Sequence, residues 1–287
     1  MKLKSIAYSS VLAAAAIAAR PIRGHSQELP VYLRDRGTGI SMSQFGTYIT
    51  KGQFLIYPFY EYYYDSNFEY EPGDFNFGTT VPERTQEQRG RYRAHEGILF
   101  LAYGISDRLA VEFEAAVISA QLDKSPSDPL LPDSLEESGL SDVEGQIRWR
   151  WNTESEKTPE FFNYFETVFP TGEKYSLIGT SDWEFKLGLG VIKGYRWGTM
   201  TIRAAVEYDA AESKLGPGEY AVEYLKRVSE KFRLFAMIEG SEDEIAVVPE
   251  IQYHVSRNVF FKANVGFGLT SKATDIAPEV GIMIALN

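Results

Sequence analysis

Residues 143–151 read Val-Glu-Gly-Gln-Ile-Arg-Trp-Arg-Trp, and this stretch decides the fold. Apolar side chains alternate in it with polar or charged ones. A repeat of two residues is typical of a β-strand, because successive side chains point to opposite faces. Residues 183–190 repeat the pattern, with Trp, Phe and Leu on one face and Glu, Lys and Gly on the other. The sequence therefore predicts strands with one apolar and one polar face.

The same alternation extends outward from these two stretches and predicts twelve strands. Their residue ranges are 53–65, 91–104, 108–121, 141–151, 161–169, 183–195, 199–209, 218–228, 232–240, 244–255, 259–270 and 277–286. The faces of 53–65 and 161–169 are not assigned, because aromatic residues occupy both parities there. We predict one all-β domain over residues 53–287, an antiparallel up-and-down transmembrane β-barrel of about 12 strands.

The connections between these strands differ in length. Short ones follow the second, sixth, eighth and tenth strands, whereas the longest span residues 66–90 and 122–140. Bacterial outer-membrane barrels have short turns on the periplasmic side and longer loops outside. The sequence therefore predicts the outer membrane of a Gram-negative-type bacterium, with both chain ends of the barrel in the periplasm.

Aromatic residues fall near the predicted strand ends, as expected at membrane interfaces. Those expected at the outer rim are Tyr92, Trp183, Tyr208 and Tyr220, and those at the inner rim are Tyr103, Trp149, Trp151, Tyr195, Phe232 and Tyr253. Twelve steps of about 3.3 Å from Trp183 to Tyr195, tilted by about 40°, rise roughly 30 Å, close to the apolar thickness of a bilayer. A soluble secreted β protein would alternate in the same way, so it remains an alternative.

The first 52 residues precede the predicted barrel. Residues 1–26 have the charged start, apolar stretch and small residues of a secretory signal peptide, and residues 27–52 form either a periplasmic segment or a plug. The chain has a formal charge of −11, and removal of residues 1–26 takes away four cations and no acid, which leaves −15. Such a charge argues against nucleic acid as a partner, since phosphate binding needs a basic face.

The polar strand face supplies the candidate pore-lining residues, in which eight acids nearly balance seven bases. They are Glu112, Glu114, Glu144, Gln146, Arg148, Arg150, Glu184, Lys186, Arg203, Glu207, Glu223, Arg227, Arg233, Glu239, Glu250, Gln252, His254, Lys262 and Asn264. A balanced wall argues against strong ion selectivity, which rings of one sign produce. These residues either line a passage or form a structural ladder. The inward glycines Gly188, Gly190, Gly266 and Gly268 could leave room for a solute or a folded segment.

For catalysis the sequence offers little. It contains no cysteine and three histidines, of which His25 falls in the predicted signal peptide. The glycines of residues 188–194 lack dinucleotide-binding spacing, and the acids of residues 123–142 match no calcium loop. We therefore predict no enzyme, no catalytic or metal-binding residue and no cofactor.

Two stretches resemble the outer-membrane family of putative transporters named for the meta pathway of phenol degradation. They are residues 139–151, and residues 169–174 followed by Ile-Gly-Thr at 178–180 and the strand pair of 183–209. The resemblance covers roughly residues 90–287. It implies passive uptake of small compounds across the outer membrane, and insertion by the barrel-assembly machinery, although Asn287 stands where such barrels usually end in an aromatic residue.

These observations together predict a narrow passive channel or transporter for small solutes, surrounded by outer-membrane lipid. The alternative is a non-conducting barrel with a structural or surface-binding role. A soluble secreted β protein is the third interpretation.

Overall fold

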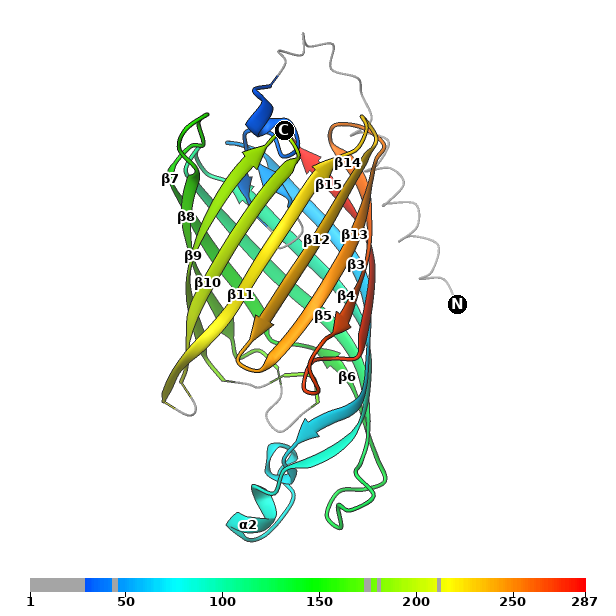
Figure 1. Ribbon diagram of the computed structural model, residues 1–287. Helices are drawn as coiled ribbons and strands as arrows, with labels where there is room; N and C mark the ends of the chain where they lie inside the picture. Colours follow the sequence, from blue (N-terminus) through cyan, green and yellow to red (C-terminus); the bar gives the residue numbers. More distant parts are fainter. Residues whose placement is uncertain (1–28, 43–45, 173–176, 180–181, 211–212) are drawn as a thin grey trace.

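A computed structural model describes residues 29–287 except 43–45, 173–176, 180–181 and 211–212 (Figure 1). The predicted signal peptide, residues 1–26, lies outside the described residues. No helix in the described part of the chain is long and apolar enough to cross a membrane.

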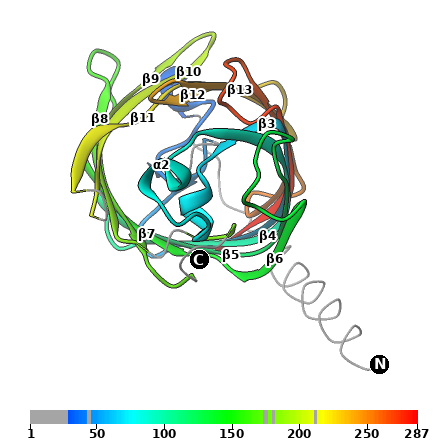
Figure 2. The same ribbon diagram turned by 90° about the horizontal axis from the view of Figure 1, so that it is seen from below.

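Twelve antiparallel strands close into a barrel (Figures 1 and 2). They are β3 (Phe54–Tyr70), β4 (Gln88–Gly104), β5 (Leu109–Asp123), β7 (Val143–Asn152), β8 (Glu160–Phe169), β9 (Glu184–Tyr195), β10 (Gly198–Asp209), β11 (Lys214–Arg227), β12 (Phe232–Ser241), β13 (Glu244–His254), β14 (Val259–Gly268) and β15 (Ile276–Leu286). Each strand pairs with its neighbours in the chain, and β15 closes the ring by pairing with β3. The predicted up-and-down barrel of twelve strands is confirmed.

The apolar face of the wall lies outside. On β7, Ile147 and Trp151 are 50% and 61% exposed, whereas the alternating Arg148 and Arg150 are each 4% exposed. A soluble barrel would turn its apolar face inward. A closed barrel with an apolar exterior and a polar interior is the architecture that spans the outer membrane. The chain is therefore an outer-membrane β-barrel.

The two ends of the barrel differ in their connections. The connections that follow β4, β7, β9, β11 and β13 lie at one end, together with the C-terminus, and we call this the periplasmic end because short turns face the periplasm. At the opposite, outer end β3, β4 and β5 continue past the other strands (Figure 1). Both β3 and β4 are longer than predicted, by five residues at Tyr70 and by three at Gln88.

An extra strand, β6 (Ser134–Leu140), lies at the outer end in a region predicted to be a loop. It pairs with β5 directly beyond β7, so that β6 and β7 follow the same edge of β5 with a break at Ser141 and Asp142. The helical turns η2 (Pro72–Phe75) and α2 (Val81–Arg84) join β3 to β4. Figures 1 and 2 together place them beyond the outer end, over part of its opening.

The aromatic residues predicted at the two rims are exposed on the lipid-facing side of the barrel, with one exception. Tyr92 was predicted to face lipid at the outer rim, and this is wrong. Its ring stacks on Phe68, 4.8 Å between centroids, and it packs beside the buried Leu122 inside the extended part of the wall. Tyr92 has the same parity as the buried Ala94, Ile98 and Phe100 of β4, so it faces inward, and β4 continues three residues before the predicted start, so Tyr92 is not at a strand end.

The two strands without assigned faces carry aromatic rings on both sides. On β8, Phe162 and Tyr164 are 2% and 0% exposed, whereas Phe161 and Phe165 face outward. The inward rings cover the glycines of β9: a Cβ at Gly188 would lie 2.0 Å from Tyr164, and one at Gly190 would lie 2.1 Å from Phe162. The lumen space beside these two glycines is therefore filled by the Tyr164 and Phe162 rings of β8 and is not available to a solute.

Candidate channel lumen

Residues 29–42 and 46–52, which we call the N-terminal segment, lie at and within the periplasmic mouth of the barrel (Figure 1). The segment contains η1 (Val31–Leu33), β1 (Ile40–Ser41) and β2 (Tyr48–Ile49). Ile40, Met42 and Ile49 are at most 1% exposed and pack in one cluster with Tyr57 and Phe100 of the wall. An apolar cluster that joins the segment to the wall holds it inside the barrel.

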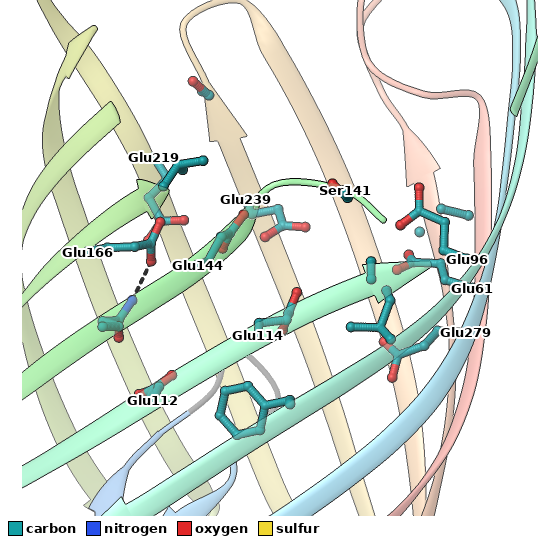
Figure 3. Close-up of a pocket in the computed structure, with 18 of the residues that line it drawn as sticks. Glu61, Glu96, Glu112, Glu114, Ser141, Glu144, Glu166, Glu219, Glu239 and Glu279 are labelled. Carbon is teal, nitrogen blue, oxygen red and sulfur yellow. Dashed lines mark hydrogen bonds between the residues drawn. The ribbon is translucent and has the colours of Figure 1, made fainter. Parts of the chain in front are cut away.

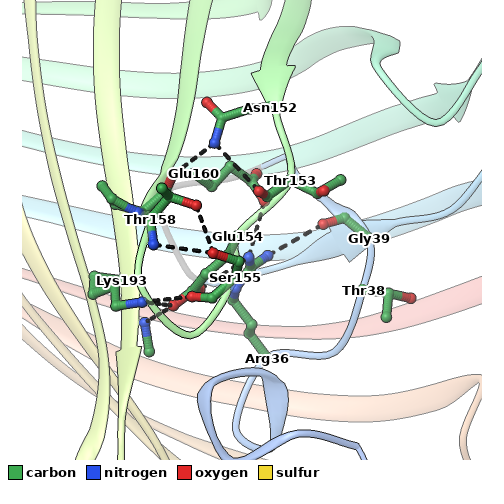
Figure 4. A network of polar contacts seen from close by, with 12 residues as sticks. Arg36, Thr38, Gly39, Asn152, Thr153, Glu154, Ser155, Thr158, Glu160 and Lys193 are labelled. Atoms are coloured by element: carbon green, nitrogen blue, oxygen red, sulfur yellow. Dashed lines mark hydrogen bonds and ion pairs between the residues drawn. The ribbon is translucent and has the colours of Figure 1, made fainter.

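Buried ion pairs also hold the segment (Figure 4). The guanidinium of Arg36 lies 3.2 Å from a carboxylate oxygen of Glu154 and 2.9 Å from one of Glu160. Arg150 donates hydrogen bonds of 3.0 Å to the carbonyl oxygens of Thr38 and Gly39. Glu154 also lies 3.2 Å from the ammonium of Lys193, and Glu160 lies 3.5 Å from the guanidinium of Arg150. Arg36 and the two acids are almost fully buried, so each of these charges depends on its partners within the network.

A second set of contacts fixes the segment to β11. The carboxylate of Asp35, which is 1% exposed, accepts a 3.0 Å hydrogen bond from the backbone N–H of Arg227 and lies 3.9 Å from the ammonium of Lys226. Burial raises the pKa of Tyr48 above its ordinary range, although nearby Arg36 opposes the shift, so this phenol stays neutral. The segment is thus bound to both sides of the barrel.

On the outer side of the N-terminal segment, the lumen holds a cavity of about 660 Å³ (Figure 3). Met42 belongs to its lining on the periplasmic side, and Glu244 and Ala273 belong to it at the outer end. The cavity therefore extends from the segment to the outer mouth.

Carboxyl groups dominate the described lining of this cavity. Thirteen acids face three cations, Arg148, Lys186 and Arg203; the acids are Glu61, Glu96, Glu112, Glu114, Asp142, Glu144, Glu166, Glu184, Glu207, Glu219, Glu239, Glu244 and Glu279. Figure 3 shows many of these carboxylates projecting from several different strands toward one space. The nearly balanced charge predicted for the lumen does not hold for this cavity.

Each of the three cations is already paired. Lys186 lies 2.8 Å from Glu166, Arg148 lies 2.6 Å from Glu112, and Arg203 contacts both Glu219 and Glu223, the latter at 3.0 Å. No ion pair within the described part of the chain involves Glu96, Glu114 or Glu144. The cavity thus keeps an excess of carboxyl groups after its cations are matched.

One side of the cavity carries both apolar and acidic residues. The inward faces of β3, β4 and β5 contribute an apolar group to the lining, Tyr57, Phe59, Ile98, Phe100 and Ile118, and four of its acids, Glu61, Glu96, Glu112 and Glu114. The carboxyl groups of β7 to β12 line the other side. A solute in the cavity would therefore meet carboxyl groups on both sides and apolar residues on the side of β3, β4 and β5.

The structure separates the nineteen candidate residues into two groups. Eleven contribute to the cavity lining: Glu112, Glu114, Glu144, Gln146, Arg148, Glu184, Lys186, Arg203, Glu207, Glu239 and Asn264. The other eight, which do not belong to it, are nearer the periplasmic ends of their strands: Arg150, Glu223, Arg227, Arg233, Glu250, Gln252, His254 and Lys262. Lys262, for example, is buried 3.5 Å from Glu250 and over the ring of Tyr57, 4.6 Å from its centroid.

Several lining carboxyl groups were not among the candidates. Glu61 and Glu166 lie on the two strands whose faces were not assigned, and Glu96 lies on β4, where apolar residues also face inward. Glu219 has the same parity as the candidate Glu223 on β11, and Glu279 has the parity opposite to that of the apolar Val280, Ile282 and Ile284 on β15. Continuing the alternation to the strand ends would have found these two.

The comparisons with known proteins support the fold. No protein-family model and no curated protein matches the chain. Among solved structures, an outer-membrane channel from Pseudomonas putida F1 aligns with a TM-score of 0.60 and 13% identity, covering 83% of this chain and 97% of that one. The translocator domain of the autotransporter NalP from Neisseria meningitidis aligns with a TM-score of 0.50 and 9% identity, covering 82% and 89%. At such identities the likeness shows the barrel fold alone. The resemblance to the meta-pathway family stays a prediction.

Proposed function

We propose that this protein is a passive outer-membrane channel for small solutes and that it favours cations over anions. The observation that carries the proposal is the excess of carboxyl groups over cationic groups in the lumen cavity. Charged rings of one sign in a water-filled pore attract ions of the opposite sign and repel their counterparts. The apolar residues that lie among the carboxyl groups on β3, β4 and β5 suit organic cations with a hydrocarbon part as well as inorganic ones.

The test is the zero-current potential of the purified protein in a planar bilayer across a KCl gradient. A cation-preferring lumen sets this potential toward the equilibrium potential of K⁺. A triple variant with Glu96→Gln, Glu114→Gln and Glu144→Gln removes three lumen carboxylates that form no ion pair among the described residues, and should move the potential toward zero. The matched control is Glu136→Gln, Glu156→Gln and Glu230→Gln, which removes three exposed carboxylates outside the lumen. A potential on the Cl⁻ side of zero would contradict the proposal.

The N-terminal segment favours a second candidate function, a non-conducting barrel. Its apolar cluster and ion pairs occupy the periplasmic mouth, through which any solute must leave. A chain that lacks residues 29–50 separates the two candidates. If this chain conducts with cation preference and the whole chain conducts weakly, the segment restricts a channel. If neither chain conducts, the barrel has a structural or surface-binding role.

A further inference from the structure

We propose that the periplasmic rim of the barrel binds the headgroups of anionic glycerophospholipids in the inner leaflet. Each periplasmic turn, together with the chain that enters β3, carries an exposed Lys or Arg. These six residues, which we call the cation ring, are Lys51, Arg108, Lys157, Arg196, Lys231 and Arg257. None of their side chains forms an ion pair within the described part of the chain.

The cation ring is distinct in a chain whose formal charge is −11. The same turns also carry the exposed acids Asp107, Glu156 and Glu230, so the six cations and three acids leave a net charge of +3. The loops at the outer end have the opposite sign, with exposed acids that include Asp74, Glu87, Asp133, Glu242 and Asp243. Positive charge therefore collects at the one end that faces the periplasmic leaflet.

Outward aromatic side chains place the cation ring at the depth of lipid headgroups. Arg196 lies between Tyr195 and Trp197, whose rings stack 4.8 Å apart and are 41% and 53% exposed. Lys231 directly precedes the exposed Phe232. Because amphipathic rings prefer the membrane–water interface, the cations beside them lie level with lipid phosphates. Lys and Arg at this depth attract anionic lipid, each raising affinity by about fivefold.

The inference depends on the barrel and its orientation in the membrane, and not on whether the lumen conducts. The partner fits an anionic lipid better than a soluble acidic protein because the six cations are spread over the five periplasmic turns and the entry to β3, and are not gathered in one patch. A ring around the barrel matches the shell of lipid that surrounds it.

The four tryptophans allow a direct test. Trp149, Trp151 and Trp197 lie at the periplasmic end and Trp183 at the outer end. A Trp183→Phe chain therefore reports only the periplasmic end, and a chain with Trp149→Phe, Trp151→Phe and Trp197→Phe reports only the outer end. Both are reconstituted in bilayers that contain brominated phosphatidylglycerol or brominated phosphatidylcholine, which quench nearby tryptophan fluorescence.

Phosphatidylglycerol should quench the periplasmic tryptophans more strongly than phosphatidylcholine, and the outer tryptophan equally or less. The preference should be lost at high salt, which screens surface charge. In the Trp183→Phe chain, replacing all six ring cations with Gln should abolish it. The double change Arg196→Gln and Arg257→Gln should lower it by at least about fivefold.

The matched control is Arg91→Gln with Lys214→Gln, which removes two exposed cations near the outer end and should leave the periplasmic preference unchanged. Heat-modified mobility in detergent gels checks that each variant still forms a barrel. Equal quenching by the two lipids, or a preference that survives loss of all six cations, would overturn the proposal. Equal quenching would favour a soluble anionic partner for the cation ring.

Discussion

The outer and periplasmic halves of the barrel are built from the same strands but hold different interiors. The inward face of β9 begins with Glu184 and Lys186, which line the open cavity, and ends at Gly194. A Cβ at Gly194 would lie 1.7 Å from the carbonyl oxygen of Tyr32, and the Gly194 N–H donates to Glu154 at 2.8 Å. The alternation decides which residues face inward, whereas the size and charge of those residues decide where the lumen is open.

The largest effect should follow removal of the N-terminal segment. The natural chain has no cysteine, so one introduced by Gln252→Cys would be the only thiol in the protein. Gln252 is 1% exposed in the periplasmic half, so the thiol should be unreactive in the whole chain. Without residues 29–50 it should react with a membrane-impermeant maleimide as fast as an exposed thiol.

The control for this experiment is Glu230→Cys, which lies exposed on a periplasmic turn and should react equally in both chains. Protection of the Gln252→Cys thiol in the shortened chain would mean that the barrel closes by itself, without help from the segment.

A smaller effect should come from the buried ion pairs of the segment. Arg36→Met removes one of two cations from each of Glu154 and Glu160, which keep Lys193 at 3.2 Å and Arg150 at 3.5 Å. It should therefore weaken segment binding by less than the cost of about 3–5 kcal/mol for a buried charge left with no partner. Trypsin should then cleave residues 29–52 faster while the barrel stays intact, as followed by mass spectrometry. Arg34→Met, whose side chain is 45% exposed, should change cleavage little beyond losing its own site. Equal protection in both variants would show that apolar packing alone holds the segment.

The packing between β8 and β9 in the barrel wall should be sensitive to one added methyl group. Gly188→Ala places a Cβ within the ring of Tyr164, and overpacking of this kind costs about 1–3 kcal/mol. Unfolding by urea in detergent micelles measures the loss. Gly97→Ala is the matched control, because its Cβ would face outward with no atom closer than 4.0 Å. Similar stability of the two variants would mean that the Tyr164 ring moves aside freely.

The smallest effect should be that of a single carboxyl group. Glu114→Gln removes one of thirteen acids from the cavity, so the zero-current potential in a KCl gradient should fall only slightly. Glu136→Gln, on the exposed face of β6 at the outer end, should not change it. If Glu114→Gln alone abolished cation preference, selectivity would depend on one position and not on the summed charge of the lumen.

Much of the barrel could be predicted from residues 143–151 and their repeats, because lipid outside and polar groups inside impose a strict period of two. The faces of β8 could not be predicted, since Phe and Tyr serve both environments. Phe161 and Phe165 face lipid, while Phe162 and Tyr164 cover glycines on the next strand. The face that an aromatic residue of a strand occupies cannot be predicted until the residue beside it on the neighbouring strand is known.

The charge of the cavity was mispredicted for a related reason. Counting acids and bases over all inward positions includes Arg227, Arg233 and Lys262, which lie in the periplasmic half and do not belong to the cavity lining. The same count omits Glu61 and Glu166, whose strands had no assigned faces. Local periodicity identifies a face but does not tell how high along the barrel axis each residue lies, because strand tilt and register set that height.

The extended part of β3, β4 and β5, with β6 and α2, projects farther from the outer end than any other described part of the chain (Figure 1). Its own apolar cluster around Tyr70, Leu122 and Leu131 supports it without contact with the membrane. On an intact cell this extension of the wall is therefore the part of the protein that an antibody or a bacteriophage meets first. Sequence drift that evades such recognition can accumulate there while the chemistry of the lumen stays the same.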